Sequence, residues 1–170
     1  MVRRPIRRVC LRPDGVRAIP QALEAIAAAD LVVIGPGSLY TSVIPILLVK
    51  ELADALADSP ARVGLVMNLM TEPGETDNYT AVDHLLAIRR HAPRVSIHRV
   101  LLNTTLIPEP VIRDYAAKGA QPVPPDTELL RALGCQPVER DLLLPGPKVR
   151  HDPQKLGKVI QELAAEEATR

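Results

Sequence analysis

The stretch LVVIGPGSLYTS at positions 31–42 combines an apolar run with a glycine-rich turn. Its first four residues are all apolar and do not alternate with polar residues, which is typical of a strand buried on both faces of a parallel sheet. The turn at 35–42 leads into residues 43–57, whose apolar positions follow helical spacing. A buried strand, a glycine turn and a helix in this order predict the start of a β-α-β unit.

The same alternation continues along the chain. We expect strands at 31–34, 62–67, 96–102 and 136–140, and helices at 19–29, 43–57, 78–91, 107–118, 126–133 and 153–167. Alternating strands and helices predict an α/β fold, a Rossmann-like, doubly wound and mostly parallel sheet with helices on both faces. We expect one domain over residues 1–170. Gly119 should end its helix, and Asp152 should cap the last one.

The first 17 residues are rich in arginine and allow two interpretations. They form a basic arm for an anionic partner, or Ile6, Val9 and Leu11 form a short edge strand that the flanking charges protect from aggregation. The arginines are Arg3, Arg4, Arg7, Arg8, Arg12 and Arg17.

Composition excludes several classes of function. With 21 Lys+Arg against 20 Asp+Glu, and three Tyr without Phe or Trp, we expect no nucleic-acid partner. No apolar run is long enough to span a bilayer and the N-terminus lacks a signal peptide, so we expect a cytoplasmic protein. Cys10 and Cys135 are far apart, and the four histidines show no metal-ligand spacing, so no metal site is expected.

Ligands of open parallel sheets bind beyond the carboxyl ends of the strands, where this chain has polar segments. In the turn Gly35–Ser38, the glycines let the backbone approach a ligand, and the following helix start offers unpaired amides that suit a phosphate. Thr41 adds a hydroxyl. The alternative is a tight turn capped by Ser38.

The segment after the second strand is a dense polar loop. Asn68 and Thr71 can hydrogen-bond a base or sugar, and Glu75 can accept from a sugar hydroxyl. The alternative is a connecting loop in which Gly74 forms a turn and Asp77 or Asn78 caps the next helix.

Two further segments carry candidate ligand-binding side chains. Asn103, at the end of the third strand, is either a ligand contact or a turn former. Arg150 can pair bidentately with a phosphate, next to the expected cap Asp152. His84 either faces the site or packs. No base with a recognisable nucleophile partner stands out, so no catalytic residue is assigned.

The segments Gly35–Ser42, Met70–Thr76 and Arg150–Asp152 resemble the YvcK-like gluconeogenesis factor family. This family is related to the CofD-like 2-phospho-L-lactate transferases of coenzyme F420 biosynthesis. The resemblance runs almost end to end and includes Asp83 and His84. It implies a Rossmann-like fold, a nucleotide ligand, notably UDP-N-acetylglucosamine, and a regulatory role in cell shape and cell-wall homeostasis during gluconeogenic growth.

Carried over to this sequence, the resemblance implies that the glycine turn holds phosphates, that the second loop lines the ligand cleft and that Arg150 completes it. The candidate ligand-binding residues are Gly35, Pro36, Gly37, Ser38, Thr41, Asn68, Thr71, Pro73, Gly74, Glu75, Thr76, Asn103 and Arg150.

The sequence departs from this family in three ways. The family's Gly-Gly-Gly-Thr-Gly loop and Asp-Asp-Gly-Gly-Ser segment are absent, so the chain is expected to equal only the C-terminal half of such a protein. Glu72 stands where the family usually has Gln, and Ile46 where it has Asn. We therefore expect a homo-oligomer or a separate N-terminal half as partner. The alternatives are a phospholactate transferase-like enzyme and an inactive truncated remnant.

Overall fold

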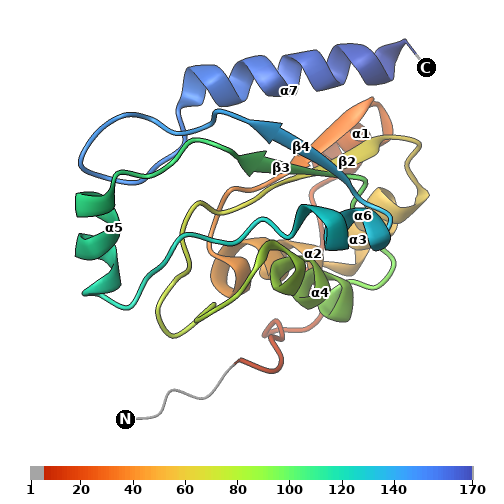
Figure 1. The fold of residues 1–170 in the computed structure, drawn as a ribbon. Helices are drawn as coiled ribbons and strands as arrows, with labels where there is room; N and C mark the ends of the chain where they lie inside the picture. Colours follow the sequence, from red (N-terminus) through yellow and green to blue (C-terminus); the bar gives the residue numbers. More distant parts are fainter. Residues whose placement is uncertain (1–5, 170) are drawn as a thin grey trace.

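The computed structural model describes residues 6–169 and confirms the α/β fold. Its sheet is entirely parallel, and its four strands lie side by side in chain order (Figure 1). The strands are β1 (Leu31–Ile34), β2 (Arg62–Val66), β3 (Arg99–Asn103) and β4 (Gln136–Arg140). The two central strands, β2 and β3, are apolar and buried at their centres, as expected for strands covered on both faces, whereas β4 buries only Val138.

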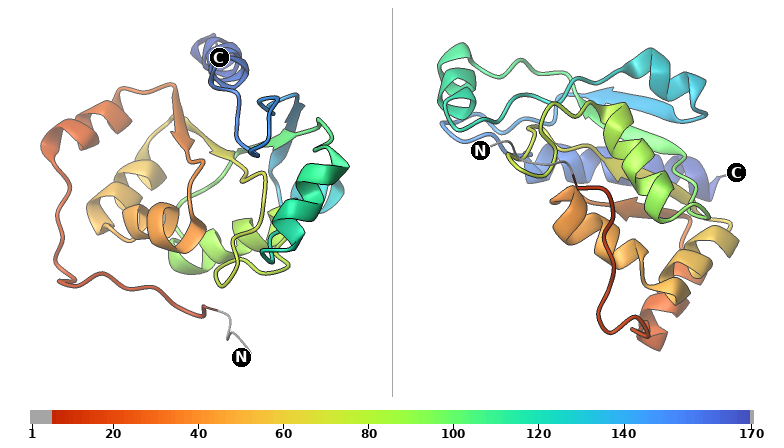
Figure 2. Two further views of the ribbon diagram at one scale, coloured as in Figure 1. Left: turned by 90° about the vertical axis from the view of Figure 1, so that its left-hand side faces the viewer. Right: turned by 90° about the horizontal axis from the view of Figure 1, so that it is seen from below.

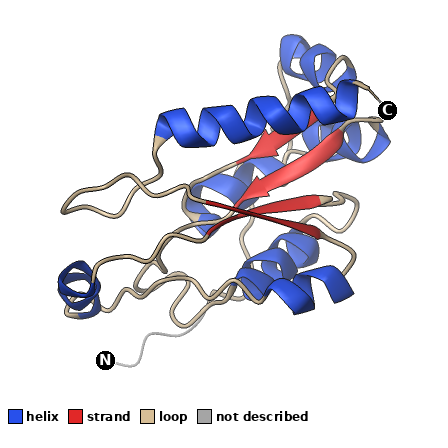
Figure 3. Ribbon diagram, turned by 45° about the horizontal axis from the view of Figure 1, so that its top comes forward, coloured by secondary structure: helices blue, strands red, loops and turns tan. Residues whose placement is uncertain are grey.

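The helices cover the two faces unequally. Because neighbouring parallel strands are joined by right-handed crossovers, most of the helices between strands gather on one face, and α7 lies on the other (Figures 1 and 3). The helix α5 lies beyond the carboxyl ends of the strands (Figure 1). The helical elements are α1 (Pro20–Ala27), the π-helical turn η1 (Leu39–Val43), α2 (Ile44–Leu47), α3 (Lys50–Asp58), α4 (Ala81–His91), α5 (Glu109–Ala116), α6 (Thr127–Ala132) and α7 (Pro153–Ala168).

Two apolar clusters fill the space between these layers. The larger one joins the strands to the helices of the crowded face, and Ile44, Leu85 and Ile88 are fully buried in it. The smaller one joins Val66 and Leu101 of the sheet to the α7 face. Asp152 accepts from the amides of Gln154 and Lys155, so the expected cap of α7 is confirmed. Gly119 follows α5 with φ +84°, as its expected role as a stop requires.

The segment predicted as one helix over 43–57 is interrupted. It begins earlier, as the π-helical turn at Leu39, and breaks at Val49, whose backbone is extended at ψ 107°. The break gives α3 its own direction, so that Ile44 of α2 and Leu56 of α3 are both buried. A strict helical repeat does not reveal such a change of axis.

The start of α4 also differs from the prediction. Thr80 caps this helix through a reciprocal capping box with Asp83, so the prediction of Asp77 or Asn78 as cap was wrong. Asp77 instead accepts from the amide of Gly74, and Asn78 adopts a left-handed conformation with φ 60°. The capping pair was present in the sequence as Thr-x-x-Asp.

The edge strand predicted from Ile6, Val9 and Leu11 does not form in the described residues. This segment is a strap that crosses the helices of the crowded face (Figure 2), and the Val9 amide donates to Nε2 of His91 at 3.2 Å. Helices lie between the strap and the sheet, so no strand edge is within its reach. Arg3 and Arg4 lie outside the described residues, and the basic-arm interpretation stays a prediction.

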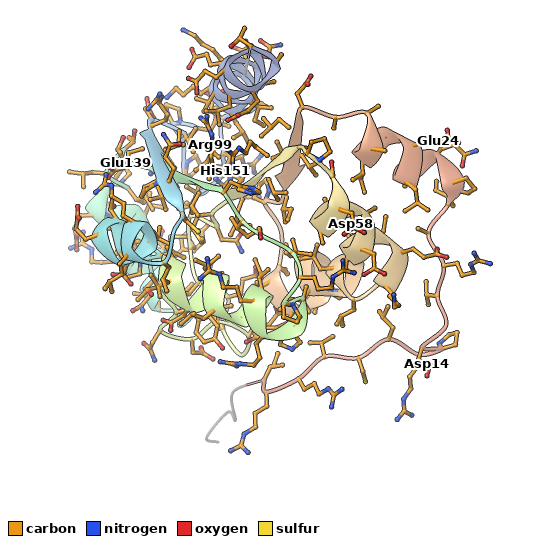
Figure 4. All side chains as sticks on the ribbon, turned by 90° about the vertical axis from the view of Figure 1, so that its right-hand side faces the viewer. Asp14, Glu24, Asp58, Arg99, Glu139 and His151 are labelled. Atoms are coloured by element: carbon orange, nitrogen blue, oxygen red, sulfur yellow. The ribbon has the colours of Figure 1, made fainter. Side chains whose placement is uncertain are left out.

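A buried ion-pair network joins the start of β3 to the end of α7. Arg99 lies beneath α7 (Figure 4), with 4% of its side chain exposed. It donates to Glu166 at 2.8 Å and to Glu167, and Arg62 approaches Glu167 at 3.8 Å. Arg99 and Glu167 are both shielded from water, so removing Arg99 takes a close cation from a buried carboxylate, which is costly.

We predict that Arg99→Met destabilises the chain by about 3 kcal/mol, because Glu167 loses its closest cation in a buried site. Urea denaturation followed by circular dichroism measures this loss. Arg94→Met is the matched control: Arg94 pairs with Asp58 at 2.9 Å with 56% of its side chain exposed, so its loss should cost less than about 1 kcal/mol. Equal losses in the two variants would contradict the prediction.

Candidate functional site

Four loops meet beyond the carboxyl ends of the strands, on the side of the molecule that faces the viewer in the left panel of Figure 2. They are the glycine turn after β1, residues 67–80 after β2, residues 104–108 after β3 and residues 141–152 after β4. This is the edge at which open parallel sheets bind their ligands.

A small open cavity of about 200 Å³ lies among these loops. We call it the turn pocket. The residues that matter for its chemistry come from three of the loops and include five of the predicted site residues. They are Pro36, Gly37, Ser38, Asn68, Glu72, Arg150 and His151, of which Glu72 and His151 were not in the predicted set.

The glycine turn is held in place by Asn68. The Gly37 amide donates to Oδ1 of Asn68 at 3.3 Å, and Nδ2 of Asn68 donates to the Gly37 carbonyl at 3.0 Å. The expectation that this turn presents free amides is therefore wrong for Gly37, and Pro36 has no amide hydrogen. Gly35 has φ +75°, and a Cβ there would lie 3.3 Å from the carbonyl oxygen of Val66, so the turn requires glycine.

Ser38 does not cap the helix that follows the turn. Its side chain makes no cap hydrogen bond and instead donates to Oε2 of Glu72 at 2.5 Å. Its carbonyl accepts from the amides of Ser42 and Val43. Within residues 6–169, the amides of Leu39 and Thr41 have no protein acceptor. The start of η1 therefore keeps unpaired donors beside the turn.

The β4–α7 loop brings Arg150 and His151 to the turn pocket. Antiparallel pairing of Leu143 with His151 folds this loop back, and Tyr115 of α5 supports it by accepting from the Val149 amide at 3.1 Å. Among the described residues, the exposed Arg150 guanidinium has no carboxylate within ion-pair distance. It is therefore available to an anionic ligand.

His151 places a buried ring nitrogen against the same pocket. Its Nε2 is shielded from solvent and has no hydrogen-bond partner among the described residues. Burial lowers the pKa of His151, and a bond to the Met67 carbonyl opposes this shift. The ring is therefore neutral near pH 7. Sequence reasoning noted His151 only as part of a motif, and the bridge to Leu143 that positions it leaves no local sequence signal.

Several predicted residues of the second loop serve its structure. The Thr71 amide donates to the Gln121 carbonyl at 2.7 Å, and its hydroxyl accepts from the Gln121 amide at 3.0 Å. The Thr76 hydroxyl accepts from the Glu72 amide at 2.8 Å. Thr71 and Thr76 are both almost fully buried, so the loop is closed on itself at these two points.

The remaining predicted residues lie away from the turn pocket. Gly74 turns the chain with φ 89°, and Pro73 packs beside Gly119. One carboxylate oxygen of Glu75 is buried without a partner, and Glu75 does not line the turn pocket. Thr41 is exposed on η1.

Asn103 lines a different cavity, of about 420 Å³, on the other side of the β2 loop. Its Oδ1 accepts from the amides of Thr105 and Leu142, the latter at 3.0 Å, and its Nδ2 donates to the Thr105 carbonyl. These bonds give Asn103 the role of a turn former, the alternative that the sequence left open.

His84 packs in the core. It is 3% exposed, its Nδ1 donates to the Thr80 carbonyl at 2.7 Å, and its ring lies edge-on to Tyr79. Burial lowers the pKa of His84, and the bond to Thr80 and the charges of Asp83 and Glu72 oppose this shift.

Metal-binding clusters and membrane-spanning helices are both missing from the described part of the chain. Residues 6–169 contain no cluster of three or more His, Cys, Asp or Glu side chains that could hold a metal ion. None of the helices in the same residues is both long and apolar enough to cross a membrane.

Relatives of this chain are about twice as long. It is 39% identical to the gluconeogenesis factor of Bacillus subtilis over 163 residues, which cover 95% of this chain and 51% of the relative. It is 42% identical to the gluconeogenesis factor of Halalkalibacterium halodurans over 158 residues, 92% of this chain and 49% of the relative. The chain thus spans about half the length of the curated relatives it matches.

A solved structure supports the same relationship. The crystal structure of a member of the UPF0052 family from Bacillus halodurans superposes with a TM-score of 0.88 and 41% identity, covering 92% of this chain and 50% of that one. The model of the 2-phospho-L-lactate transferase CofD family matches residues 1–143. A match over so much of the sequence shows that this chain belongs to the CofD family, and the relatives that we compared within it are gluconeogenesis factors.

Proposed function

We propose that this chain binds a nucleotide sugar, UDP-N-acetylglucosamine, in the turn pocket and acts as a regulator of the gluconeogenesis-factor type. The observation that carries the proposal is Arg150, an arginine without a carboxylate partner in the described structure, beside the hydroxyl of Ser38 and the amide of Asn68. Guanidinium, hydroxyl and amide groups at the carboxyl edge of a parallel sheet suit a diphosphate.

The size of the turn pocket limits which part of the ligand it holds. A cavity of about 200 Å³ corresponds to roughly seven water molecules. That volume accommodates a diphosphate, whereas the uridine and the sugar must extend beyond it. The unpaired edge of β1 borders the turn, so the rest of the ligand site is expected where the other half of a full-length relative would lie.

The biological role proposed for the chain is control of cell shape and cell-wall homeostasis during growth on gluconeogenic carbon sources. The names of the relatives, which are gluconeogenesis factors, support the link to gluconeogenic growth. A regulator needs a ligand site whose occupancy changes with metabolism, and it needs no base or nucleophile.

We predict that UDP-N-acetylglucosamine binds in isothermal titration calorimetry and that Arg150→Ala weakens this binding at least about tenfold, because a charge-assisted pair with phosphate is lost. Arg140→Ala is the matched control: it removes the same charge from β4, where the Arg140 side chain donates to the Glu139 carbonyl and does not line the turn pocket. Absence of heat together with absence of competition by UDP would contradict the proposal.

His151 favours a second function, transfer of a phospholactyl-type group from an activated nucleotide to a deazaflavin. Such a transfer requires a base for the acceptor hydroxyl, and the neutral, unpartnered Nε2 of His151 lies at the turn pocket. Mass spectrometry of a reaction containing the chain, the activated donor and the deazaflavin decides between the two functions. The reaction is also run with the half of a longer relative that this chain does not match. Absence of product under these conditions would exclude the transferase function.

The open edge of β1 supports the proposal of a protein partner. All four residues of β1 are apolar and only half-buried, and an apolar groove of about 250 Å³ runs beside it. Ile46, which lines this groove, is 59% exposed. An apolar strand edge with no charged residue within the strand pairs readily with another chain. In the longer relatives the remaining half is the natural occupant; for this chain alone we propose a second copy.

We predict that the chain self-associates in size-exclusion chromatography with light scattering and that Ile46→Lys shifts it toward the monomer, because a charge in the groove opposes burial. Leu129→Lys is the matched control, since Leu129 is 57% exposed on α6 and does not line the groove. A monodisperse wild-type monomer at high protein concentration would refute self-association through this edge.

A further inference from the structure

Glu72 puts a negative charge among the groups expected to hold a ligand's phosphates. Its Oε2 accepts from the Ser38 hydroxyl at 2.5 Å, and its Oε1 accepts from Nδ2 of Asn68 at 3.3 Å. Both donors line the turn pocket. The carboxylate therefore takes the hydrogen bonds that a phosphate oxygen would otherwise receive.

The backbone of Glu72 is fixed, whereas its side chain can rotate. The Glu72 amide donates to the Thr76 hydroxyl at 2.8 Å, and its carbonyl accepts from the Thr76 amide at 2.9 Å. Thr76 is 1% exposed and anchors this turn. Glu72 itself is only partly buried, so its carboxylate can turn toward solvent without moving the loop.

The charge of Glu72 is not cancelled by the arginine of the same pocket. Within residues 6–169, Arg150 and Glu72 form no ion pair, although both line the turn pocket. An anion that enters meets one attractive and one repulsive charge. Ligands that differ by one negative charge at this point should therefore be bound with different affinities.

Building on the proposed nucleotide-sugar function, we propose that Glu72 is a specificity-determining residue that favours a sugar-capped diphosphate over a free nucleoside diphosphate. A free terminal phosphate carries close to one extra negative charge at neutral pH, because its second pKa is about 6. Esterification by a sugar removes that charge. The sugar also brings hydroxyl donors that can replace Ser38 as partners of the Glu72 carboxylate.

The test compares the dissociation constants of UDP and UDP-N-acetylglucosamine for the wild type and for Glu72→Gln by calorimetry. Glutamine keeps the shape and can still accept from Ser38, but it removes the charge. We expect UDP to bind about tenfold more tightly to the variant, a change of about 1.4 kcal/mol, whereas UDP-N-acetylglucosamine changes less than about threefold.

Glu109→Gln is the control, because it removes the same charge from the exposed first turn of α5 and does not line the turn pocket. It should leave the affinity ratio of the two nucleotides unchanged. If Glu72→Gln also leaves that ratio unchanged while both nucleotides bind, the role of Glu72 is refuted and the proposed function stands. If neither nucleotide binds to wild type or variant, the proposed function fails, and the role of Glu72 with it.

Discussion

The reciprocal hydrogen bonds between the Asn68 side chain and the backbone of Gly37 are the constraint on which the candidate site depends. They join the loop after β1 to the loop after β2, and the Ser38–Glu72 hydrogen bond adds a second link between the same loops. With the turn fixed, the Ser38 hydroxyl reaches Glu72, and the start of η1 keeps unpaired amides beside the turn. An amide side chain suits this task because it donates and accepts at once, whereas a carboxylate could only accept.

The strand order explains why the turn pocket lies at the edge of the sheet. Four parallel strands in chain order place most of their connecting helices on one face, leave α7 to cover the other, and leave β1 as an apolar edge (Figure 1). The turn pocket sits at the end of that edge strand, where the glycine turn, the loop after β2 and the β4–α7 loop line it. The match to only about half of the Bacillus subtilis relative and of the solved structure fits this geometry, because further strands beside β1 would extend the sheet at the site.

Much of the fold could be read from the sequence, because apolar strands such as residues 31–34 and helical caps such as Asp152 leave local signals. The expectation that residues 31–34 are buried on both faces was wrong, because β1 is an edge strand and all four of its residues are only half-buried. The break at Val49 and the course of the strap around His91 depend on packing between distant segments, so no local pattern predicts them. The site shows the same division. The glycine turn and Arg150 were predicted from polar segments beside strands and helices. Thr71 and Thr76 are polar residues of the same kind, but their buried hydroxyls accept from backbone amides and hold the loop together. Composition alone does not separate a hydroxyl that faces a ligand from one that closes a loop.

The charges of the turn pocket argue against a general anion site. A cavity lined only by arginines and amides would bind any phosphate, and inorganic phosphate would compete with a scarcer nucleotide. Here Arg150 and Glu72 line one small cavity without pairing, so the net charge offered to a ligand is near zero. Affinity must then come from directed hydrogen bonds rather than from charge alone. Such bonds form readily only if the donors are already in position before a ligand binds. Glu72 holds two of these donors in place, because its carboxylate accepts from the Ser38 hydroxyl and from the Asn68 amide group.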